Sequence, residues 1–240
     1  MTRSRTGRRL CLGVAAATCL ASHAADAACR LSLALALDVS GSVDASEYRL
    51  QLDGLAEALT DPDVVQALLA IPEAPVALFV FEWSASEYQR TLQDWVILDD
   101  PAQIRGVASR LRTWDRGVSP QATGLGAAMA HGASRLAGGP GCDQATLDVS
   151  GDGENNDWPT PEALRSSGAI EGVRINGLVI AEDDETAASL SAYFRARVIQ
   201  GPDAFVEVAR GFSDYSRAMR RKLIREVQGL PVAMIDKIAQ

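Results

Sequence analysis

Histidine is almost missing from this chain. Its 240 residues contain only two, His23 and His131. A zinc site built from several imidazoles is therefore excluded, and a Ser-His-Asp triad would have to use one of these two rings. His131 lies on a helix that the pattern of small residues predicts at 123–137, where we expect it to be structural or exposed rather than catalytic.

Long apolar runs are also missing, apart from one near the start of the chain. The uncharged run 10–20 follows a segment with four arginines and precedes the small residues ASHAADAA. This pattern predicts a secretory signal peptide at residues 1–28, cleaved after Ala24, Ala27 or Ala28, and its apolar run is too short to span a membrane. A retained membrane anchor is the alternative. We expect a periplasmic or secreted protein whose mature chain is not inserted in a membrane.

Positive charge is in short supply. The chain has 23 Lys and Arg residues against 31 Asp and Glu residues, which gives a net charge of −8. Removal of residues 1–28 takes away four arginines and one aspartate, so the net charge of the mature chain becomes −11. Such acidity argues against nucleic acids and anionic membranes as partners.

Cysteine is sparse once the leader is set aside. Of the four cysteines, Cys11 and Cys19 fall within residues 1–28, which leaves Cys29 and Cys142. Each of these two stands at the N-terminal edge of a strand-like run. If the two strands are parallel neighbours, their starting ends lie together and a disulfide is geometrically reasonable in an oxidising compartment. Two unrelated free thiols are the alternative.

Several catalytic signatures are absent as well. Neither DVSGS nor DVSGD satisfies the G-x-S-x-G pattern of a serine hydrolase. A phosphatase of the haloacid dehalogenase type needs D-x-D-x-T/V, and here Ser40 replaces the second aspartate. The segment TGLGAAMA at 123–130 lacks the third glycine of a nucleotide-binding loop and does not follow a strand. We therefore expect the protein not to be an enzyme, with a metal-dependent hydrolase as the alternative.

Strand-like and helix-like patterns alternate along the rest of the chain. The run 31–37 is continuously apolar, as expected for a strand buried on both faces, and a capping box at Asp44 and Glu47 opens the helix behind it. Alternating β and α units predict an α/β fold of the doubly wound, Rossmann-like type, with a mainly parallel sheet and helices on both faces. We expect one domain at residues 29–230 and a C-terminal tail at 231–240. The other strands are predicted at 75–83, 88–98, 145–151, 173–181 and 204–209, and the other helices at 100–114, 123–137, 184–198 and 212–227, with short helices at 64–70 and after Pro161.

Oxygen-bearing side chains gather where the first strand ends. Asp38, Ser40 and Ser42 form the pattern D-x-S-x-S, and LDVSG recurs at 147–151, at the end of another predicted strand. In such sheets, ligands bind beyond the carboxyl ends of the strands, where the crossover direction switches. Oxygen donors suit a hard cation, Mg²⁺, Mn²⁺ or Ca²⁺, rather than zinc or copper. A simple helix-capping turn is the alternative, because aspartate and serine are common there.

These residues resemble a known family. D-x-S-x-S at the end of a first buried strand is similar to the opening of the metal-ion-dependent adhesion site (MIDAS) of von Willebrand factor A domains. The resemblance implies that Thr123 and Asp152 complete the site, although QAT stands where the family often has GGT or GRT. It also implies that Ser40, Ser42 and Thr123 bind the metal through their hydroxyls. Asp38 and Asp152 would act mostly through water and hydrogen bonds.

A closer resemblance covers about residues 30–228. The segments ALDVSGSVD, FEWS, LDVSGDGENN, INGLVI and RRKLIREV are similar to those of an exported bacterial group of von Willebrand A-like proteins, the DUF1194 family. The resemblance implies a divalent-metal-dependent protein-binding module, with Mg²⁺ or else Mn²⁺ or Ca²⁺ as cofactor. One coordination position would be left for an acidic side chain of an unidentified partner protein. A structural domain with a non-functional metal site is a further alternative.

The second LDVSG leaves a choice between two carboxylates. By analogy with the first copy, Asp148 would support the metal, whereas the register of the family favours Asp152. We favour Asp152, because a loop carboxylate after a strand is easier to keep ionised than one inside a buried strand. Glu82, Ser84 and Asn155 are candidates for the rim of the site, although an ordinary strand end is as good an interpretation of the first two.

Overall fold

The computed structural model describes residues 29–228. The predicted signal peptide at 1–28 and the predicted tail at 231–240 lie outside the described residues, and both stay predictions. Within the described range, no helix is both long and apolar enough to cross a membrane.

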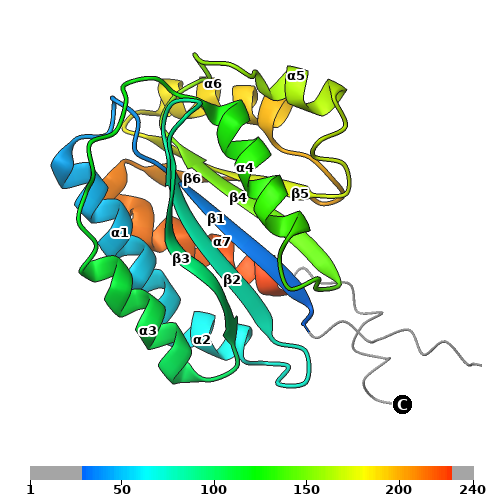
Figure 1. Ribbon diagram of the computed structural model, residues 1–240. Coiled ribbons are helices and arrows are strands. Elements are labelled where there is room, and N and C mark those ends of the chain that lie inside the picture. Colours follow the sequence, from blue (N-terminus) through cyan, green and yellow to red (C-terminus); the bar gives the residue numbers. More distant parts are fainter. Residues whose placement is uncertain (1–28, 229–240) are drawn as a thin grey trace, which may run out of the picture.

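Strands and helices follow one another in the predicted alternation (Figure 1). The strands within the described range are β1 (Leu31–Asp38), β2 (Val76–Trp83), β3 (Gln89–Leu98), β4 (Gln144–Gly151), β5 (Arg174–Ala181) and β6 (Val206–Arg210). The α-helices there are α1 (Ala45–Thr60), α2 (Pro62–Leu68), α3 (Pro101–Arg112), α4 (Leu125–Ala137), α5 (Pro161–Ser166), α6 (Asp184–Tyr193) and α7 (Tyr215–Gln228). A π-helical turn, η1 (Phe194–Val198), follows α6, and a 3-10 turn, η2 (Phe212–Asp214), precedes α7.

Some helix ends differ from the sequence prediction. The helix predicted from residue 123 begins at Leu125, because Gly124 is the N-cap and the backbone of Thr123 is bonded to Asn156: its amide donates to the side chain of Asn156, and its carbonyl accepts from the amide of Asn156. The helix predicted at 184–198 changes to π geometry for its last turn, and the closing helix opens with a 3-10 turn. Apolar periodicity continues through both of these changes, so it could not reveal them.

The strands form a single sheet in the order β3-β2-β1-β4-β5-β6. Every neighbouring pair is parallel except β2 and β3. From β1 the chain moves outward to β2 and β3, then returns to β4 on the other side of β1 and continues to β5 and β6. The predicted doubly wound, mainly parallel α/β fold is therefore confirmed. Its switch point lies between the carboxyl ends of β1 and β4, where Asp38 and Gly151 are the last strand residues.

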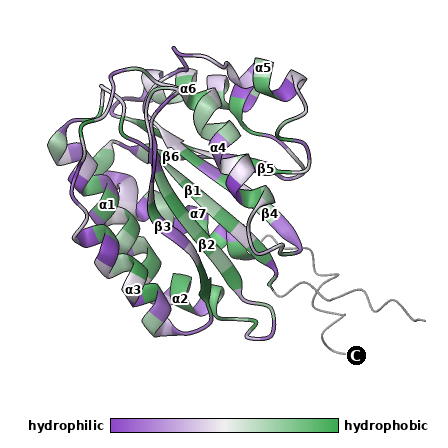
Figure 2. Ribbon diagram, in the orientation of Figure 1, coloured by the Kyte–Doolittle hydropathy of each residue, from purple (hydrophilic) through white to green (hydrophobic). Residues whose placement is uncertain are grey.

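β1 is buried along its whole length, with large side chains on one face and small ones on the other. Its four leucines pack with α1, α3 and α7, and each buried leucine stabilises the fold by roughly 1.5–3 kcal/mol. Its alternate alanines lie in a second cluster, with α4, α5 and α6. Helices thus cover both faces (Figure 1), and β1 and β2 are hydrophobic over most of their length (Figure 2).

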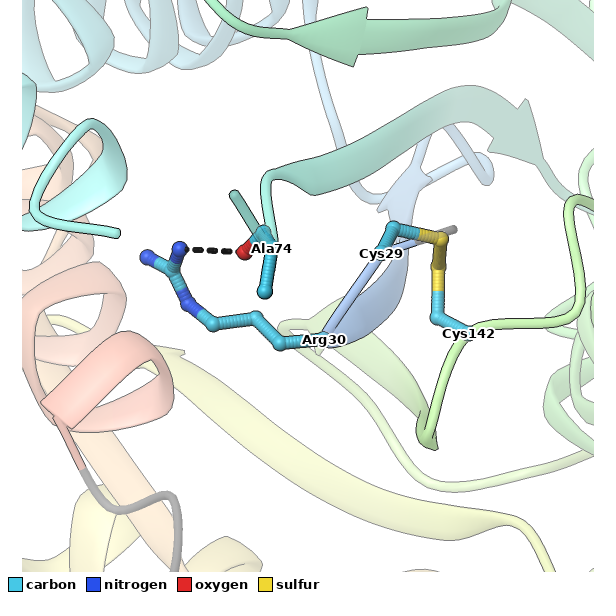
Figure 3. The surroundings of a disulfide bond; sticks show 4 residues. All are labelled: Cys29, Arg30, Ala74 and Cys142. Atoms are coloured by element: carbon cyan, nitrogen blue, oxygen red, sulfur yellow. Dashed lines mark hydrogen bonds between the residues drawn. A yellow bond between two sulfur atoms is a disulfide. The ribbon is translucent and has the colours of Figure 1, made fainter. Parts of the chain in front are cut away.

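The amino ends of β1 and β4 are joined covalently. Cys29 and Cys142 form a disulfide with a Cα–Cα distance of 4.7 Å, which confirms the predicted bridge (Figure 3). Beside it, the buried guanidinium of Arg30 donates to the carbonyl of Ala74 at 2.7 Å and to that of Leu68 at 3.0 Å, near the C-terminus of α2. The bond to Leu68 satisfies a carbonyl group that the end of α2 leaves without a partner in the helix. The disulfide end of the sheet is therefore the end opposite the switch point.

Candidate metal centre

Asp38 ends β1 in a fully buried position. Its Oδ1 accepts a hydrogen bond from the amide of Ser40 at 2.8 Å, and its backbone carbonyl accepts one from Gln51 at 2.9 Å. Its Oδ2 is buried and has no hydrogen-bond partner among residues 29–228. A Cβ added to Gly151 would lie 3.3 Å from this Oδ2, so the orphaned oxygen faces the end of β4. A buried carboxylate oxygen without a donor is costly unless a cation satisfies it.

The other predicted site residues gather around this carboxylate. The hydroxyl of Ser42 donates to Oδ1 of Asp152 at 2.7 Å. The Oγ atoms of Ser40 and Ser42 are 3.4 Å apart, and Oγ1 of Thr123 is 3.4 Å from Oγ of Ser40. Asp38, Ser40 and Thr123 are buried, whereas Ser42 is exposed, so the group opens to solvent on one side. The structure brings all five predicted residues together, from three separate parts of the chain.

Two close backbone contacts hold Thr123 in this group. Its amide donates to Oδ1 of Asn156 at 2.7 Å, and its carbonyl accepts from the amide of Asn156 at 3.0 Å. The amide of Gly124 donates to the carbonyl of Ser84 at 2.7 Å. A Cβ on Gly124 would lie 2.8 Å from that carbonyl oxygen, so only glycine permits the approach. Sequence reasoning missed Asn156, although its place four residues after Asp152 was a usable signal.

Burial disfavours the charged form of both carboxylates of the site. Burial, with a smaller effect from the Asp152 carboxylate, raises the pKa of Asp38 to about 7. Burial also raises the pKa of Asp152, against the hydrogen bond from Ser42. A divalent cation between them would reverse both effects, because it favours the ionised forms.

The donor set fits a hard cation. Among the described residues, no three His, Cys, Asp or Glu side chains are grouped so that they could hold a metal ion. A cation at the switch point would therefore depend on the three hydroxyls as well as the two carboxylates. Oxygen donors of this kind suit Mg²⁺, Mn²⁺ or Ca²⁺, and Mg²⁺ usually keeps several waters.

Glu82, Ser84 and Asn155, the three candidates for the rim, form hydrogen bonds to the segments around the site. The buried carboxylate of Glu82 accepts hydrogen bonds from the hydroxyls of Tyr48 at 2.7 Å and Tyr88 at 2.9 Å. The hydroxyl of Ser84 donates to the carbonyl of Pro120 at 3.1 Å. Oδ1 of Asn155 accepts from the amide of Gly126, also at 3.1 Å, at the start of α4. A direct role of Glu82, Ser84 or Asn155 at the rim stays a prediction.

Asp148 belongs to a different cluster. It lies inside β4, where its buried carboxylate forms an ion pair with the buried Lys222 of α7. Lys222 also pairs with Glu226 at 3.2 Å, and Glu226 accepts a hydrogen bond from Asn176 at 2.6 Å. The structure thus places Asp152, and not Asp148, beside Ser42.

His131 packs as an aromatic ring in the layer of α4. Its centroid lies 4.8 Å from that of Phe81, and burial lowers the pKa of its imidazole. Neither feature prepares it to act as a base at the switch point, two turns of helix away from Thr123.

Solved structures share this fold at low sequence identity. Proximal thread matrix protein 1 from the mussel byssus is 14% identical with a TM-score of 0.59, over 85% of this chain and 49% of that protein. Another structure of the mussel protein, with a zinc-occupied MIDAS motif, is 16% identical with a TM-score of 0.56, over 84% of this chain and 47% of that one.

Two bacterial proteins are similar in the same way. The pilus adhesin SpaC from Lactobacillus rhamnosus GG is 13% identical with a TM-score of 0.59, over 84% of this chain and 31% of the adhesin. A von Willebrand factor type A protein from Catenulispora acidiphila is 13% identical with a TM-score of 0.56, over 83% of this chain and 43% of that protein. The chain thus spans less than half the length of each of these structures, and the likeness establishes the fold.

Sequence comparison supplies the family. No curated protein matches the chain. The family model described as a protein of unknown function (DUF1194) matches residues 28–231. The chain therefore belongs to the DUF1194 family, and its fold is that of a von Willebrand factor A domain.

Proposed function

We propose that the protein is an exported, divalent-metal-dependent protein-binding module. The observation that carries this proposal is the buried Oδ2 of Asp38, which has no hydrogen-bond partner among residues 29–228, at a strand end where four other oxygen-bearing side chains gather. Ser40, Ser42 and Thr123 would hold the cation through their hydroxyls. Asp38 and Asp152 would act through water and hydrogen bonds. The bound cation supplies positive charge at an otherwise acidic surface.

The partner in this proposal is a protein that offers an acidic side chain. A chain with a net charge of −8 repels an acidic ligand, and a cation offsets that repulsion at one point only. The exposed position of Ser42 leaves the solvent side of the group open for such a side chain. An adhesin and a thread matrix protein among the structures with the same fold support a role in binding rather than catalysis.

Mg²⁺ is the cation that we propose first, with Mn²⁺ and Ca²⁺ as the other candidates. A site with two carboxylates and three hydroxyls provides few charged ligands, as is typical of Mg²⁺ sites that retain water. The zinc in the MIDAS motif of the mussel protein supports the view that this fold holds a metal at such a motif.

Calorimetric titration tests the metal centre. Mg²⁺, Mn²⁺ and Ca²⁺ are titrated into the wild type and into a Ser40→Ala/Thr123→Ala variant. We expect saturable binding to the wild type and a loss of at least about tenfold in affinity in the variant, since two ligands are removed. Equal binding by the two proteins would overturn the proposal.

A capture experiment tests the protein-binding role. The immobilised protein is exposed to a periplasmic extract with Mg²⁺ or with EDTA, and the Ser40→Ala/Thr123→Ala variant serves as the control. We expect one or more proteins to be retained by the wild type with Mg²⁺ and lost with EDTA or in the variant. Metal binding without any metal-dependent capture would leave a structural metal site instead.

A further inference from the structure

A surface hollow lies at the β6 edge of the sheet, apart from the switch point. It is bounded by α6, η1, β6 and α7, which can be followed in Figure 1, and has a volume of about 360 Å³. Its polar lining consists of Arg195, Arg210, Arg217, Arg221, Asp214 and Ser191. We call it the arginine hollow. Ala187, Ala188 and Val208 form its apolar wall.

The charge of the arginine hollow is opposite to that of the chain. Four arginines and one aspartate line it, and Asp184 and Glu207 pair with two of the arginines, which leaves one positive charge in excess, whereas the chain has a net charge of −8. The four arginines come from η1, from the end of β6 and from successive turns of α7, so they surround the hollow rather than lie in a row. Their convergence in an acidic protein indicates an anionic ligand.

Existing ion pairs leave much of this donor capacity unused. Arg210 pairs with Asp184 at 2.9 Å, Arg217 with Asp214 at 2.6 Å and Arg221 with Glu207 at 2.6 Å. Each guanidinium has five N–H donors, so every one of these pairs leaves donors free. Arg195 has no hydrogen-bond or ion-pair partner within residues 29–228 and is exposed.

Ser191 provides an independent sign of a missing ligand. Its side chain lines the arginine hollow from α6 and is 3% exposed. Its Oγ is buried and has no hydrogen-bond partner among the described residues. A serine in a helix can donate to the carbonyl four residues earlier, and Ser191 does not do so. The hydroxyl of this lining residue is therefore available as a donor for an anion in the hollow.

We propose that the arginine hollow binds a phosphate group carried by a small soluble molecule. A tetrahedral phosphate presents several oxygens in different directions, which suits arginines that line the hollow from three elements. A planar carboxylate would bind one guanidinium group and leave the other three arginines without a ligand. A long polyanion would meet the acidic surface beyond the hollow, so a small phosphomonoester fits better.

Calorimetry with inorganic phosphate tests this site, in a chloride buffer containing EDTA so that no divalent cation contributes. We expect saturable binding to the wild type. Arg195→Gln should weaken it about tenfold and Ser191→Ala about fivefold, because a charged donor is worth more than a hydroxyl. Arg105→Gln, at an exposed position of α3, removes the same charge elsewhere and should change nothing.

Stability separates loss of the ligand site from loss of the fold. Ser191→Ala removes a buried hydroxyl without a partner, so its melting temperature without phosphate should equal or exceed that of the wild type. Phosphate should raise the melting temperature of the wild type more than that of Ser191→Ala. The Ser40→Ala/Thr123→Ala variant should bind phosphate normally, which makes this result independent of the metal centre.

Two further ligands test which kind of molecule carries the phosphate group. Glycerol 3-phosphate represents a soluble ester, and vesicles of phosphatidylglycerol represent a lipid headgroup, each with Arg195→Gln as control. Binding of glycerol 3-phosphate that is lost in the variant supports the proposal, whereas binding of vesicles without binding of glycerol 3-phosphate would assign the hollow to a lipid headgroup and overturn the soluble source. The proposal is overturned if phosphate, glycerol 3-phosphate and vesicles all fail to bind, if Arg195→Gln binds as well as the wild type, or if acetate binds as tightly as phosphate.

Discussion

At the scale of single residues, the two oxygens of Asp38 have different surroundings. Oδ1 accepts a hydrogen bond from the amide of Ser40, whereas Oδ2 is buried beside Gly151 and has no hydrogen-bond partner in the described part of the chain. In the metal-free protein this carboxylate is costly in its charged form, because burial and Asp152 both oppose ionisation. The cost is the physical reason to expect that a cation, directly or through water, compensates the charge.

Replacing Asp38 by its neutral isostere should separate stability from metal binding. We expect Asp38→Asn to raise the free energy of unfolding without metal, by on the order of 1–3 kcal/mol at pH 8, because it removes a buried charge. Mg²⁺ should raise the melting temperature of the wild type and not that of the variant. Asp99→Asn, at an exposed position, is the control and should behave as the wild type. A destabilised Asp38→Asn variant that still responds to Mg²⁺ would contradict this assignment.

The raised pKa of Asp38 also predicts how stability depends on pH. Its carboxyl keeps a proton up to about pH 7 when folded and loses it near 3.8 when unfolded, so the folded state binds more protons in between. The free energy of unfolding in EDTA should therefore fall as the pH rises from about 5 to about 8. Urea denaturation at several pH values measures this. Saturating Mg²⁺ should reduce or reverse the fall.

A second carboxyl contributes to the same pH dependence. Burial, with a smaller effect from Glu226, raises the pKa of Asp148 as well, although Lys222 acts in the opposite direction. Its contribution has the same sign as that of Asp38, so Asp38→Asn should show a smaller fall in stability over this pH range rather than none. An identical fall in the wild type and in Asp38→Asn would show that Asp38 titrates normally.

At the scale of elements, much of the fold could be predicted from the apolar pattern. The buried strands and the helix faces followed from runs and periods that local burial dictates, and β1, β2, β4 and β5 lie within a residue or so of their predicted ends. The ends of α4 and α6 could not be predicted in this way. They depend on bonds from Thr123 to Asn156, 33 residues away, and on a π turn that keeps the same apolar period.

The site was predictable only in part, for a related reason. Asp38, Ser40 and Ser42 are adjacent in sequence, so their convergence followed from the strand that precedes them. Thr123 and Asp152 were assigned by family resemblance, because no spacing within the chain specifies which loops meet at a switch point. The cluster around Asp148 shows the same limit, since its partner Lys222 comes from a helix 74 residues later.

The start of α4 is the element that we expect to be most sensitive to a small change. A Cβ on Gly126 would lie 2.0 Å from the carbonyl oxygen of Pro159, a backbone atom that cannot turn aside. Gly126→Ala should therefore destabilise the protein by about 1–3 kcal/mol and weaken Mg²⁺ binding, because α4 and the loop at 152–160 must separate.

A matched glycine in another helix provides the control. A Cβ on Gly106, in the middle of α3, would meet nothing within 4 Å. Gly106→Ala should stabilise the protein by roughly 0.5–1 kcal/mol, because alanine is the better helix former, and should leave Mg²⁺ binding unchanged. Thermal unfolding and calorimetry measure both effects. Similar behaviour of the two variants would argue against close packing at α4.

At the scale of the whole molecule, the disulfide and the candidate metal centre lie at opposite ends of the two central strands of the sheet. The disulfide joins the amino ends of β1 and β4 (Figure 3), and the residues of the candidate metal centre lie at the carboxyl ends of the same strands. The same two central strands carry both. The disulfide can therefore stabilise the framework of the site without contacting it.

Removing the disulfide should lower stability and spare the site. Cys29 and Cys142 are 113 residues apart, and closing a loop of that length stabilises the folded state by about 2–4 kcal/mol. We expect Cys29→Ala/Cys142→Ala to unfold at correspondingly lower urea concentration while binding Mg²⁺ with the affinity of the wild type. A variant that is folded at low temperature but has lost its metal affinity would mean that the two ends of the sheet are coupled.

The presence of a cation at the carboxyl ends of β1 and β4 is the central claim, and a crystal soaked in Mn²⁺ tests it most directly. The anomalous difference map should show one peak within coordination distance of the hydroxyl oxygens of Ser40, Ser42 and Thr123. Asp38 and Asp152 should border it, and the peak should be absent from crystals of the Ser40→Ala/Thr123→Ala variant. No peak at these residues, or a peak that persists in the variant, would contradict the account.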